Sequence, residues 1–257
     1  MFKKRIKIVF KDVTPNLLFI GAIVLLSTVI WSNAFSKKEI KTYKNAVSVI
    51  GVSTKDVVSD KAVWRISVSK KSLDRAKNIK DITVDENKVR DYIISLGFDK
   101  EALSSSQISV DTNYKAKETG YGDTTIVENY ETKSYFTINT DDVYKVSEGT
   151  NKLRQYSEEN NIILSSNSTE YTYSKYESEK IPLLKLAIGD AQDRANALVN
   201  ATSGVSKTSI GKILSARQGV FQVNSKNTES VSDYGNFDTS SIEKTIRATV
   251  SVDFNAE

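Results

Sequence analysis

The sequence predicts an α+β domain in which helices pack on mixed, largely antiparallel sheets, preceded by one N-terminal transmembrane helix. Three observations carry this prediction: a long uncharged apolar run, several stretches in which apolar and polar residues alternate, and stretches with helical periodicity. A helix–strand–polar loop–strand unit occurs at 72–138 and again at 180–254. This recurrence fits a duplicated βαββ plan, and chance explains the weak residue similarity equally well.

The apolar run covers residues 15–35 and carries no charge. As a helix rising about 1.5 Å per residue, it spans the roughly 30 Å hydrocarbon core of a bilayer. Residues 1–14 are then a basic cytoplasmic tail, and residues 36–45 a polar tether. The small residues Ser32-Asn33-Ala34 also fit a signal-peptide cleavage site, so a cleaved signal stays open. The length of the run and Trp31 favour a retained signal anchor.

Alternating stretches predict the strands, and the clearest is the last, where apolar residues occupy every second position of 246–254. The other expected strands are 47–51, 63–68, 108–114, 130–138, 162–175 and 210–220. Such alternation indicates an antiparallel sheet with one face in water. Two polar stretches, 115–125 and 222–241, predict loops, and the second is expected to be long and mobile.

Three helices are expected. The first covers 72–96, with Gly97 after its end. Thr140 is the expected cap of the second, and Pro182 lies in the first turn of the third, 180–200. Their expected inner faces are, in turn, Leu73, Ala76, Ile79, Val89, Tyr92, Ile93 and Leu96; Val143, Val146, Thr150 and Leu153; and Leu184, Ala187, Ile188, Ala191, Ala195 and Leu198. The alanines of the third helix predict a close approach to a sheet.

The composition argues against most catalytic chemistry. The chain has no cysteine and no histidine, which removes thiolate nucleophiles, the commonest general base and the commonest metal ligand. Residues 1–36 hold five of the 36 cations and one of the 32 anions, so the remaining chain has no net charge to attract nucleic acid. We therefore expect a protein that is not an enzyme, with no catalytic, cofactor-binding or metal-binding residue, no cofactor and no nucleic-acid partner.

Two groups of polar residues that contain carboxylates are candidate sites. Asp190 and Asp193 lie off the apolar stripe of the third helix, and Asp190 can pair with Arg194 four residues on, which favours a structural role. Asp111-Thr112-Asn113 resembles part of a calcium loop, but no glycine and glutamate follow at the required spacing. A carboxylate-dependent hydrolase remains a third alternative for the function.

Tyrosines gather near the predicted strands. They are Tyr114, Tyr121, Tyr130, Tyr135, Tyr171, Tyr173 and Tyr176. On one sheet face they could bind a peptide, a glycan or a second subunit. Tyrosine is also simply a favourable strand residue, and that reading stays open beside the first.

Three stretches, 47–68, 126–146 and 185–214, together resemble the SIMPL-domain family, also called the domain of unknown function 541. The family includes bacterial periplasmic immunogenic proteins and oxidative-stress-related envelope proteins. Two positions depart from its pattern: Ser59 precedes Asp60 where the family has proline, and Asn129 replaces a glycine before a tyrosine. The resemblance implies an α/β domain in the bacterial envelope, homo-oligomers for some members, and no established reaction.

These observations lead to one functional hypothesis and one alternative. The first is a membrane-anchored, non-enzymatic envelope protein whose domain, residues 46–257, self-associates and supports envelope integrity or the stress response. The alternative is an extracytoplasmic module that binds a ligand, an envelope protein or a peptide. The expected location is the bacterial inner membrane, crossed once, with the C-terminal domain in the periplasm. Release into the periplasm after signal cleavage is the alternative location.

Overall fold

The computed structural model describes residues 21, 23–32, 46–104, 107–119, 122–202, 209–228 and 234–256. Its elements are β1 (Ala46–Val58), β2 (Lys61–Ser72), α3 (Arg75–Ser95), η1 (Lys100–Ala102), β3 (Gln107–Thr119), β4 (Gly122–Thr140), α4 (Val143–Glu159), β5 (Ile163–Thr172), α5 (Tyr176–Thr202), β6 (Ile210–Gln218), β7 (Gln222–Ser225) and β8 (Glu243–Ala256). Residue 21 and residues 23–32 are helical as well.

Of the predicted transmembrane segment, residues 15–35, the structure describes residue 21 and residues 23–32, which are helical, and the others lie outside the described residues. Within the part of the chain that the structure describes, no helix combines the length and the apolar character needed to cross a bilayer. The basic tail 1–14 and the tether 36–45 also lie outside the described residues.

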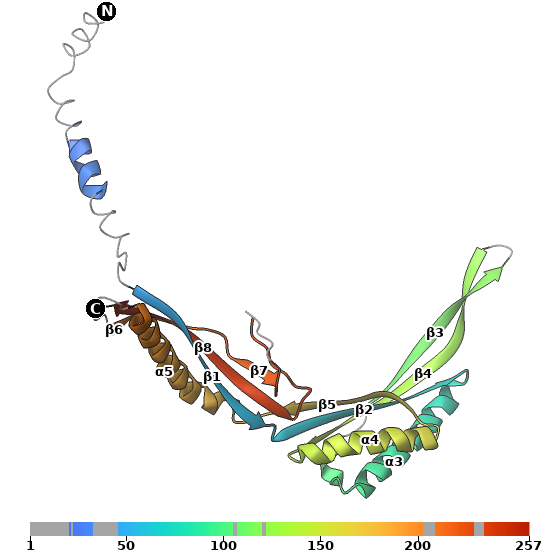
Figure 1. The fold of residues 1–257 in the computed structure, drawn as a ribbon. Coiled ribbons are helices and arrows are strands. Elements are labelled where there is room, and N and C mark those ends of the chain that lie inside the picture. Colours follow the sequence, from blue (N-terminus) through green and yellow to red (C-terminus); the bar gives the residue numbers. More distant parts are fainter. Residues whose placement is uncertain are drawn as a thin grey trace, which may run out of the picture.

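The strands form two antiparallel sheets. In the first sheet the order is β1-β8-β6, and β7 also pairs with β8. In the second sheet the order is β3-β4-β2-β5. Figure 1 shows the two sheets following one another along a bent molecule, with α5 on the first and α3 and α4 on the second. The fold is therefore α+β with antiparallel sheets, as the alternating stretches predict.

The two sheets share a strand order. The second places its strands as β3-β4-β2, with α3 before the edge strand β3 in the chain, and the first places them as β6-β8-β1, with α5 before β6. The two sheets differ in the strand that directly precedes the helix. β2 precedes α3 and pairs with β4 of the same sheet. β5 precedes α5, but it pairs with β2 of the second sheet. Only Ser59 and Asp60 lie between β1 of the first sheet and β2 of the second, so these two strands connect the sheets directly.

The strand β8 is the centre of the first sheet. Every second residue from Ile246 to Phe254 is at most 3% exposed, and the residues between them are half-buried or exposed. This confirms the predicted final strand and its single wet face. β1 pairs with β8 over its whole length, from Ala46 opposite Asn255 to Val58 opposite Glu243.

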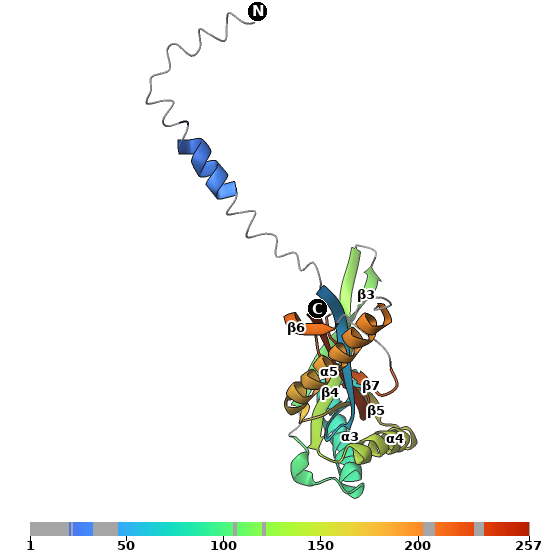
Figure 2. The same ribbon diagram turned by 60° about the vertical axis from the view of Figure 1, so that its left-hand side comes forward.

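The polar stretch 115–125 was wrongly predicted as a loop. β3 runs on to Thr119 and β4 starts at Gly122, so the stretch forms the far end of a two-stranded hairpin. Figures 1 and 2 show this hairpin extending away from α3 and α4. The described side chains of 115–117 and 124–125 are exposed. Because both faces of this part of the hairpin are exposed, neither face requires apolar side chains, and the alternating pattern that predicts a strand is absent.

The prediction of one mobile loop over 222–241 is also wrong for most of its described residues. β7 occupies Gln222–Ser225, and three of its four residues are buried. Further on, the Asp238 N–H donates to the Val223 carbonyl at 2.8 Å, and the Tyr171 N–H donates to the Thr239 carbonyl at 2.7 Å. Residues 229–233 lie outside the described residues. Backbone pairing with neighbouring strands orders this polar segment, and composition alone cannot reveal such pairing.

The predicted helices exist, but parts of their faces were misassigned. In α3, Leu73 precedes the helix and is 78% exposed, Ala76 is exposed and Ile79 is half-buried. The buried residues of α3 are Asn78, Ile82, Asp85, Glu86, Val89 and Ile93. Three of these six side chains are polar or charged, so a search for apolar periodicity does not find this face.

Smaller corrections concern the helix ends. Asp142, and not Thr140, caps α4: its side chain accepts from the Lys145 N–H. Pro182 lies inside α5, because the helix already begins at Tyr176. The buried residues of α4 include Gly149 in place of the half-buried Thr150, and those of α5 are Leu183, Ala187, Ala191, Ala195 and Val199. Leu198, which was predicted on the inner face of α5, is 52% exposed. Gly97 follows α3 as predicted and has a positive φ of 88°.

Candidate functional site

A groove lies between β1, the edge strand of the first sheet, and the side of α5. At one end of the groove, β1 and α5 are in very close contact. A Cβ on Gly51 would overlap the Ala187 carbonyl oxygen and lie 2.7 Å from Ala191 Cβ, so only glycine fits there. Ala187, Ala191 and Ala195 are fully buried against this strand. The small residues therefore bring the helix backbone directly onto β1.

Asp190 extends this contact to the open edge of β1, which is the edge that no described strand pairs with. The Val52 N–H donates to Asp190 Oδ2 at 2.7 Å, and Arg194 Nε donates to the same oxygen at 2.8 Å. The Val52 N–H and, to a smaller degree, the Arg194 guanidinium hold the pKa of Asp190 below its usual value. The carboxylate thus caps an edge amide that β8 does not reach, and the pairing of Asp190 with Arg194 expected from the sequence is confirmed.

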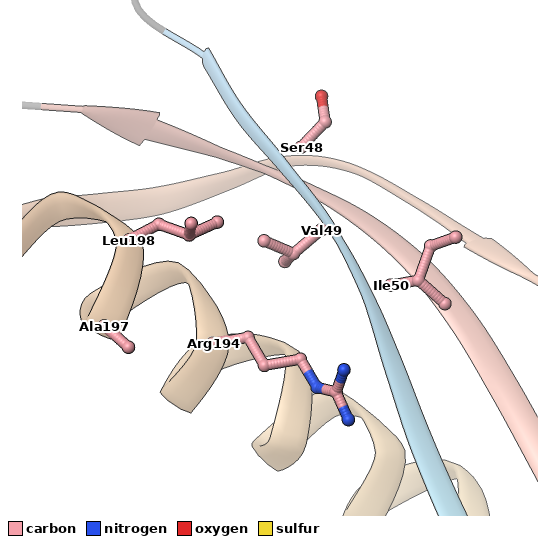
Figure 3. Close-up of a pocket in the computed structure, with 6 residues that line it drawn as sticks. All are labelled: Ser48, Val49, Ile50, Arg194, Ala197 and Leu198. Atoms are coloured by element: carbon pink, nitrogen blue, oxygen red, sulfur yellow. The ribbon is translucent and has the colours of Figure 1, made fainter. Parts of the chain in front are cut away.

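Beyond this contact the helix and the strand separate, and the groove opens. Its lining residues are Ser48, Val49, Ile50, Arg194, Ala197 and Leu198, and its volume is about 640 Å³. Figure 3 shows Val49 directed toward α5, with Arg194 and Leu198 on the helix facing the strand, while Ser48 and Ile50 point away. The volume lies within the range of small-ligand and peptide sites, and the lining is mainly apolar.

The exposure of the lining side chains differs. Val49 is 7% exposed and forms the floor, whereas Ile50 and Leu198 are 61% and 52% exposed. No lining residue carries a carboxylate. The groove offers an apolar surface, backbone hydrogen-bonding groups at a strand edge and the guanidinium of Arg194. These groups are suited to binding a ligand.

A second exposed surface is the arm, which we define as β3 with the paired part of β4, residues 107–119 and 122–135. Large apolar side chains remain exposed along it. They are Ile108, Tyr114, Ile126, Val127 and Tyr135, between 37% and 62% exposed. Cross-strand pairing brings Tyr114 opposite Val127. The printed contacts of α3 with β4 lie between Tyr130 and Phe136. The far half of the arm extends away from α3 and α4 (Figure 1).

A buried ionic cluster joins the end of the 222–241 segment to β8. Lys244 is 1% exposed, and its Nζ donates to the Asp238 carbonyl at 2.7 Å and to Asp238 Oδ2 at 3.1 Å. Burial alone would raise the pKa of Asp238, but hydrogen bonds from Ser240, Ser241 and Lys244 together hold that pKa well below its usual value. Each buried charge is paired, so we assign the cluster a structural role and call Asp238 and Lys244 the clamp.

The other candidate residues from the sequence, Asp193 and Asp111 to Asn113, do not form a common site. Asp193 is exposed on α5. Asp111 lies 3.9 Å from Lys133 Nζ, and Asn113 bonds Asn129 at 2.9 Å across the arm. Among the described residues no group of three or more acidic side chains could hold a metal ion.

The tyrosines do not form one face. Tyr171 is 5% exposed in the core of the second sheet, and Tyr173 bonds Glu179 at 3.2 Å near α5. Tyr114 and Tyr135 are exposed on the arm, and Tyr121 lies outside the described residues. Only the arm keeps the interaction surface that the tyrosine content suggested.

The model of one protein family, described as SIMPL, protein of unknown function (DUF541), matches residues 47–254. The chain belongs to the SIMPL family. The match covers both sheets and all of the helices from α3 to α5, and so includes the groove and the arm. The comparison with curated proteins gives no match. The family of this SIMPL protein was recognisable from the sequence, whereas the groove was not, because the pairing of Gly51 with Ala187 and Ala191 joins positions more than 130 residues apart.

Proposed function

We propose that this SIMPL protein is a membrane-anchored, non-enzymatic envelope module that self-associates through its arm. The observation that carries the proposal is the exposed apolar surface of the β3–β4 hairpin, from Ile108 to Tyr135. A two-stranded hairpin is at best marginally stable by itself in water. A second copy that covered the arm would bury this surface and stabilise the ribbon at the same time.

A second copy is a natural occupant because a symmetric dimer uses the same patch on both subunits. The arm also has a long open edge, since β3 is the edge strand of the second sheet. Edges of this kind pair with another chain unless they are blocked. The described side chains near the end of the arm include Lys115 and Lys117, and such charges limit uncontrolled pairing without preventing a specific contact.

The location rests on the sequence and the family. The uncharged run 15–35 is long enough to cross a bilayer, and the basic residues before it favour a cytoplasmic N-terminus. The domain would then lie in the periplasm of a bacterium, or be released there after cleavage at Ala34. A role in envelope integrity or stress is proposed from the resemblance to envelope proteins in the family.

Light scattering over a series of protein concentrations tests self-association. We expect full-length protein in detergent to form a defined oligomer, and the double variant Tyr114→Ser/Val127→Ser to be monomeric with a far-ultraviolet circular dichroism spectrum that still shows the folded domain. Tyr144→Ser is the matched control, because Tyr144 is 59% exposed on α4, away from the arm. A wild-type monomer at every concentration, or an oligomer unaffected by the double variant, would contradict the proposal.

Fractionation tests the anchor. The full-length protein should stay with membranes during carbonate extraction, because an apolar helix of this length is held by the hydrophobic effect and not by charge. Removal of residues 1–36 should release the protein into the soluble fraction. A native N-terminus at Phe35 would show that the segment is a cleaved signal.

The second candidate function is a binding module, and the groove between β1 and α5 favours it. An edge strand beside a helix is a recurring place for an extended peptide to dock. The groove and the arm belong to different sheets, so the two functions can be tested separately.

A further inference from the structure

We propose that the groove between β1 and α5 binds an extended segment of another protein, which adds a strand to the open edge of β1. The segment carries an acidic side chain and, two residues later, an apolar side chain. This site lies on the first sheet and does not depend on the arm.

The direction of the backbone groups of β1 supports strand addition. In an antiparallel pair, alternate residues turn both N–H and C=O away from the partner strand. The Val52 N–H points away from β8, since it donates to Asp190 on α5. Ser48 and Ile50 have the same parity as Val52, so their N–H and C=O groups also face the open edge. A peptide beside them gains up to four backbone hydrogen bonds.

Asp190 sets the limit of the added strand. Its carboxylate already occupies the edge amide of Val52, so a peptide can pair with Ser48 and Ile50 but not continue past that point. The closed end of the groove therefore lies beside Asp190 and Arg194. The register of a bound peptide is fixed by this end.

The side chains of the peptide alternate between the two faces of the sheet. Peptide residues opposite Val49 and Gly51 point toward α5, because Val49 does so. The residue between them lies opposite Ile50 and points away. Two peptide side chains, separated by one residue, thus enter the space beside the helix.

The helix offers two different contacts at a matching spacing. Arg194 and Leu198 are four residues apart, which is about 6 Å along a helix. Two residues of an extended strand cover about 6.6–6.8 Å. A peptide side chain near Arg194 is therefore followed, two residues along, by one near Leu198 and Ala197.

The chemistry of these contacts selects the side chains. Asp190 uses only Nε of Arg194, and no other described group pairs with this guanidinium, so its two Nη groups can bind a carboxylate. Leu198 and the floor residue Val49 accept an apolar side chain. α5 runs antiparallel to β1, since Val52 contacts Asp190 while Lys55 pairs with Glu179 at 2.6 Å. A peptide antiparallel to β1 therefore reads acidic–any–apolar.

Fluorescence anisotropy with one designed peptide tests this site. The probe is labelled acetyl-Glu-Thr-Leu-Thr-Thr-Thr-amide, titrated with the full-length protein in detergent. N-methylation of the threonine between Glu and Leu removes the N–H that faces Ile50, and we expect affinity to fall at least about tenfold. N-methylation of the leucine, whose N–H faces away from β1, should change affinity less than about twofold. Equal losses for the two methylated peptides, or no saturable binding of the parent, would overturn the proposal.

Protein variants test the two side-chain contacts. We expect Arg194→Gln to weaken binding about tenfold and to abolish the preference for the Glu peptide over its Gln analogue. Leu198→Ser should weaken binding as well, whereas Leu186→Ser, at a residue 63% exposed on the same helix, is the control and should not. If a variant unfolds, the methylated peptides on the wild-type protein still decide the question. A preference for Glu that survives Arg194→Gln would overturn the assignment of the acidic position.

Light scattering with the probe separates a foreign segment from a second copy. We expect the mass of the oligomer to stay the same when the peptide binds. A mass that falls as the peptide saturates would show that a second copy occupies the groove, and the proposal of a foreign segment would fail. Loss of oligomers in the arm variant with unchanged peptide affinity would leave this site intact while supporting the arm contact.

Discussion

The two sheets bury their helices by opposite means. In the first sheet, Gly51 of β1 meets Ala187 and Ala191 of α5, so the backbones approach closely and little side-chain volume lies between them. In the second sheet, large side chains fill the space: Trp64 and Phe136 are at most 2% exposed. The same strand order is therefore stabilised once by close backbone contact and once by bulky side chains.

The second sheet also buries charged and amide side chains against α3, whereas between β1 and α5 the buried Ser53 hydroxyl donates to the Leu183 carbonyl at 2.7 Å. Glu86 of α3 accepts from Ser134 Oγ at 2.7 Å and from Arg90 Nε at 2.8 Å. Asn78 donates to the Tyr130 carbonyl at 2.8 Å. These bonds fix the position of α3 over β4, whereas α5 is positioned mainly by its close approach to Gly51, with hydrogen bonds from Val52 and Ser53 beside it. The stability of the contact between β1 and α5 should therefore fall when side-chain volume is added. The stability of the second sheet should fall when side-chain volume is removed.

The largest expected effect concerns the junction between the sheets. Replacement of residues 224–240 by a short Gly/Ser linker removes Asp238 and leaves the ammonium of Lys244 buried without its partner. Loss of one partner of a buried pair costs about 3–5 kcal/mol. It also removes the Thr239 carbonyl that binds the Tyr171 N–H. We expect a large drop in the free energy of unfolding by urea denaturation.

The control for this deletion replaces residues 229–233 alone, which retains all of these contacts. It should leave the urea midpoint nearly unchanged. Two separate unfolding transitions in the 224–240 variant would show that the segment couples the two sheets. An unchanged midpoint would show that the clamp contributes little.

Removal of volume tests the second sheet. Trp64→Ala should lower the free energy of unfolding by about 3–5 kcal/mol, because a fully buried aromatic side chain leaves a cavity. The ring of Trp64 packs against Gly149 of α4, where an added Cβ would lie 3.1 Å from it, so this position of the helix has no side chain that could fill the cavity. Thermal unfolding followed by circular dichroism measures the loss, with Trp64→Phe expected to lose less.

Addition of volume tests the first sheet. Ala191→Leu should cost about 1–3 kcal/mol, because its side chain lies directly against Gly51. Gln192→Leu, one residue on and exposed, should cost little. Equal melting temperatures of the two variants would refute the close contact as the source of stability.

These tests also show which parts of the fold can be read from the sequence. The strand at 246–254 was predictable because one face is buried along its whole length, and α5 was predictable because its alanines recur at helical spacing. The face of α3 was not, because Asn78 and Glu86 are buried by bonds to strands far away in sequence. The candidate site shared this limit: the role of Gly51 depends on a helix that begins 125 residues later.

Acid should weaken the clamp. The pKa of Asp238 is depressed in the folded protein, so its contribution to stability is present above the unfolded pKa and is lost as pH falls through the acidic range. We expect wild-type stability to decline on acidification below about pH 4, near the ordinary pKa of an aspartate. Asp238→Asn should be less stable at pH 7 and show a weaker decline. Parallel pH profiles for the two proteins would contradict the role of this carboxylate.

The smallest effect concerns the cap that α5 places on the edge of β1. Asp190→Ala removes the acceptor of the Val52 N–H and should cost about 1 kcal/mol or less, since the pair is partly exposed. Asp190→Asn keeps an oxygen at the same place and should cost less than the alanine variant, while Asp193→Asn on the exposed side should cost nothing measurable. Hydrogen exchange gives the sharper measurement, because the Val52 amide has Asp190 as its partner. Its exchange should accelerate in Asp190→Ala and stay slow in Asp193→Asn. If Val52 remains protected in Asp190→Ala, close packing at Gly51 alone shields the edge, and the helix then defines the end of the groove by shape without its carboxylate.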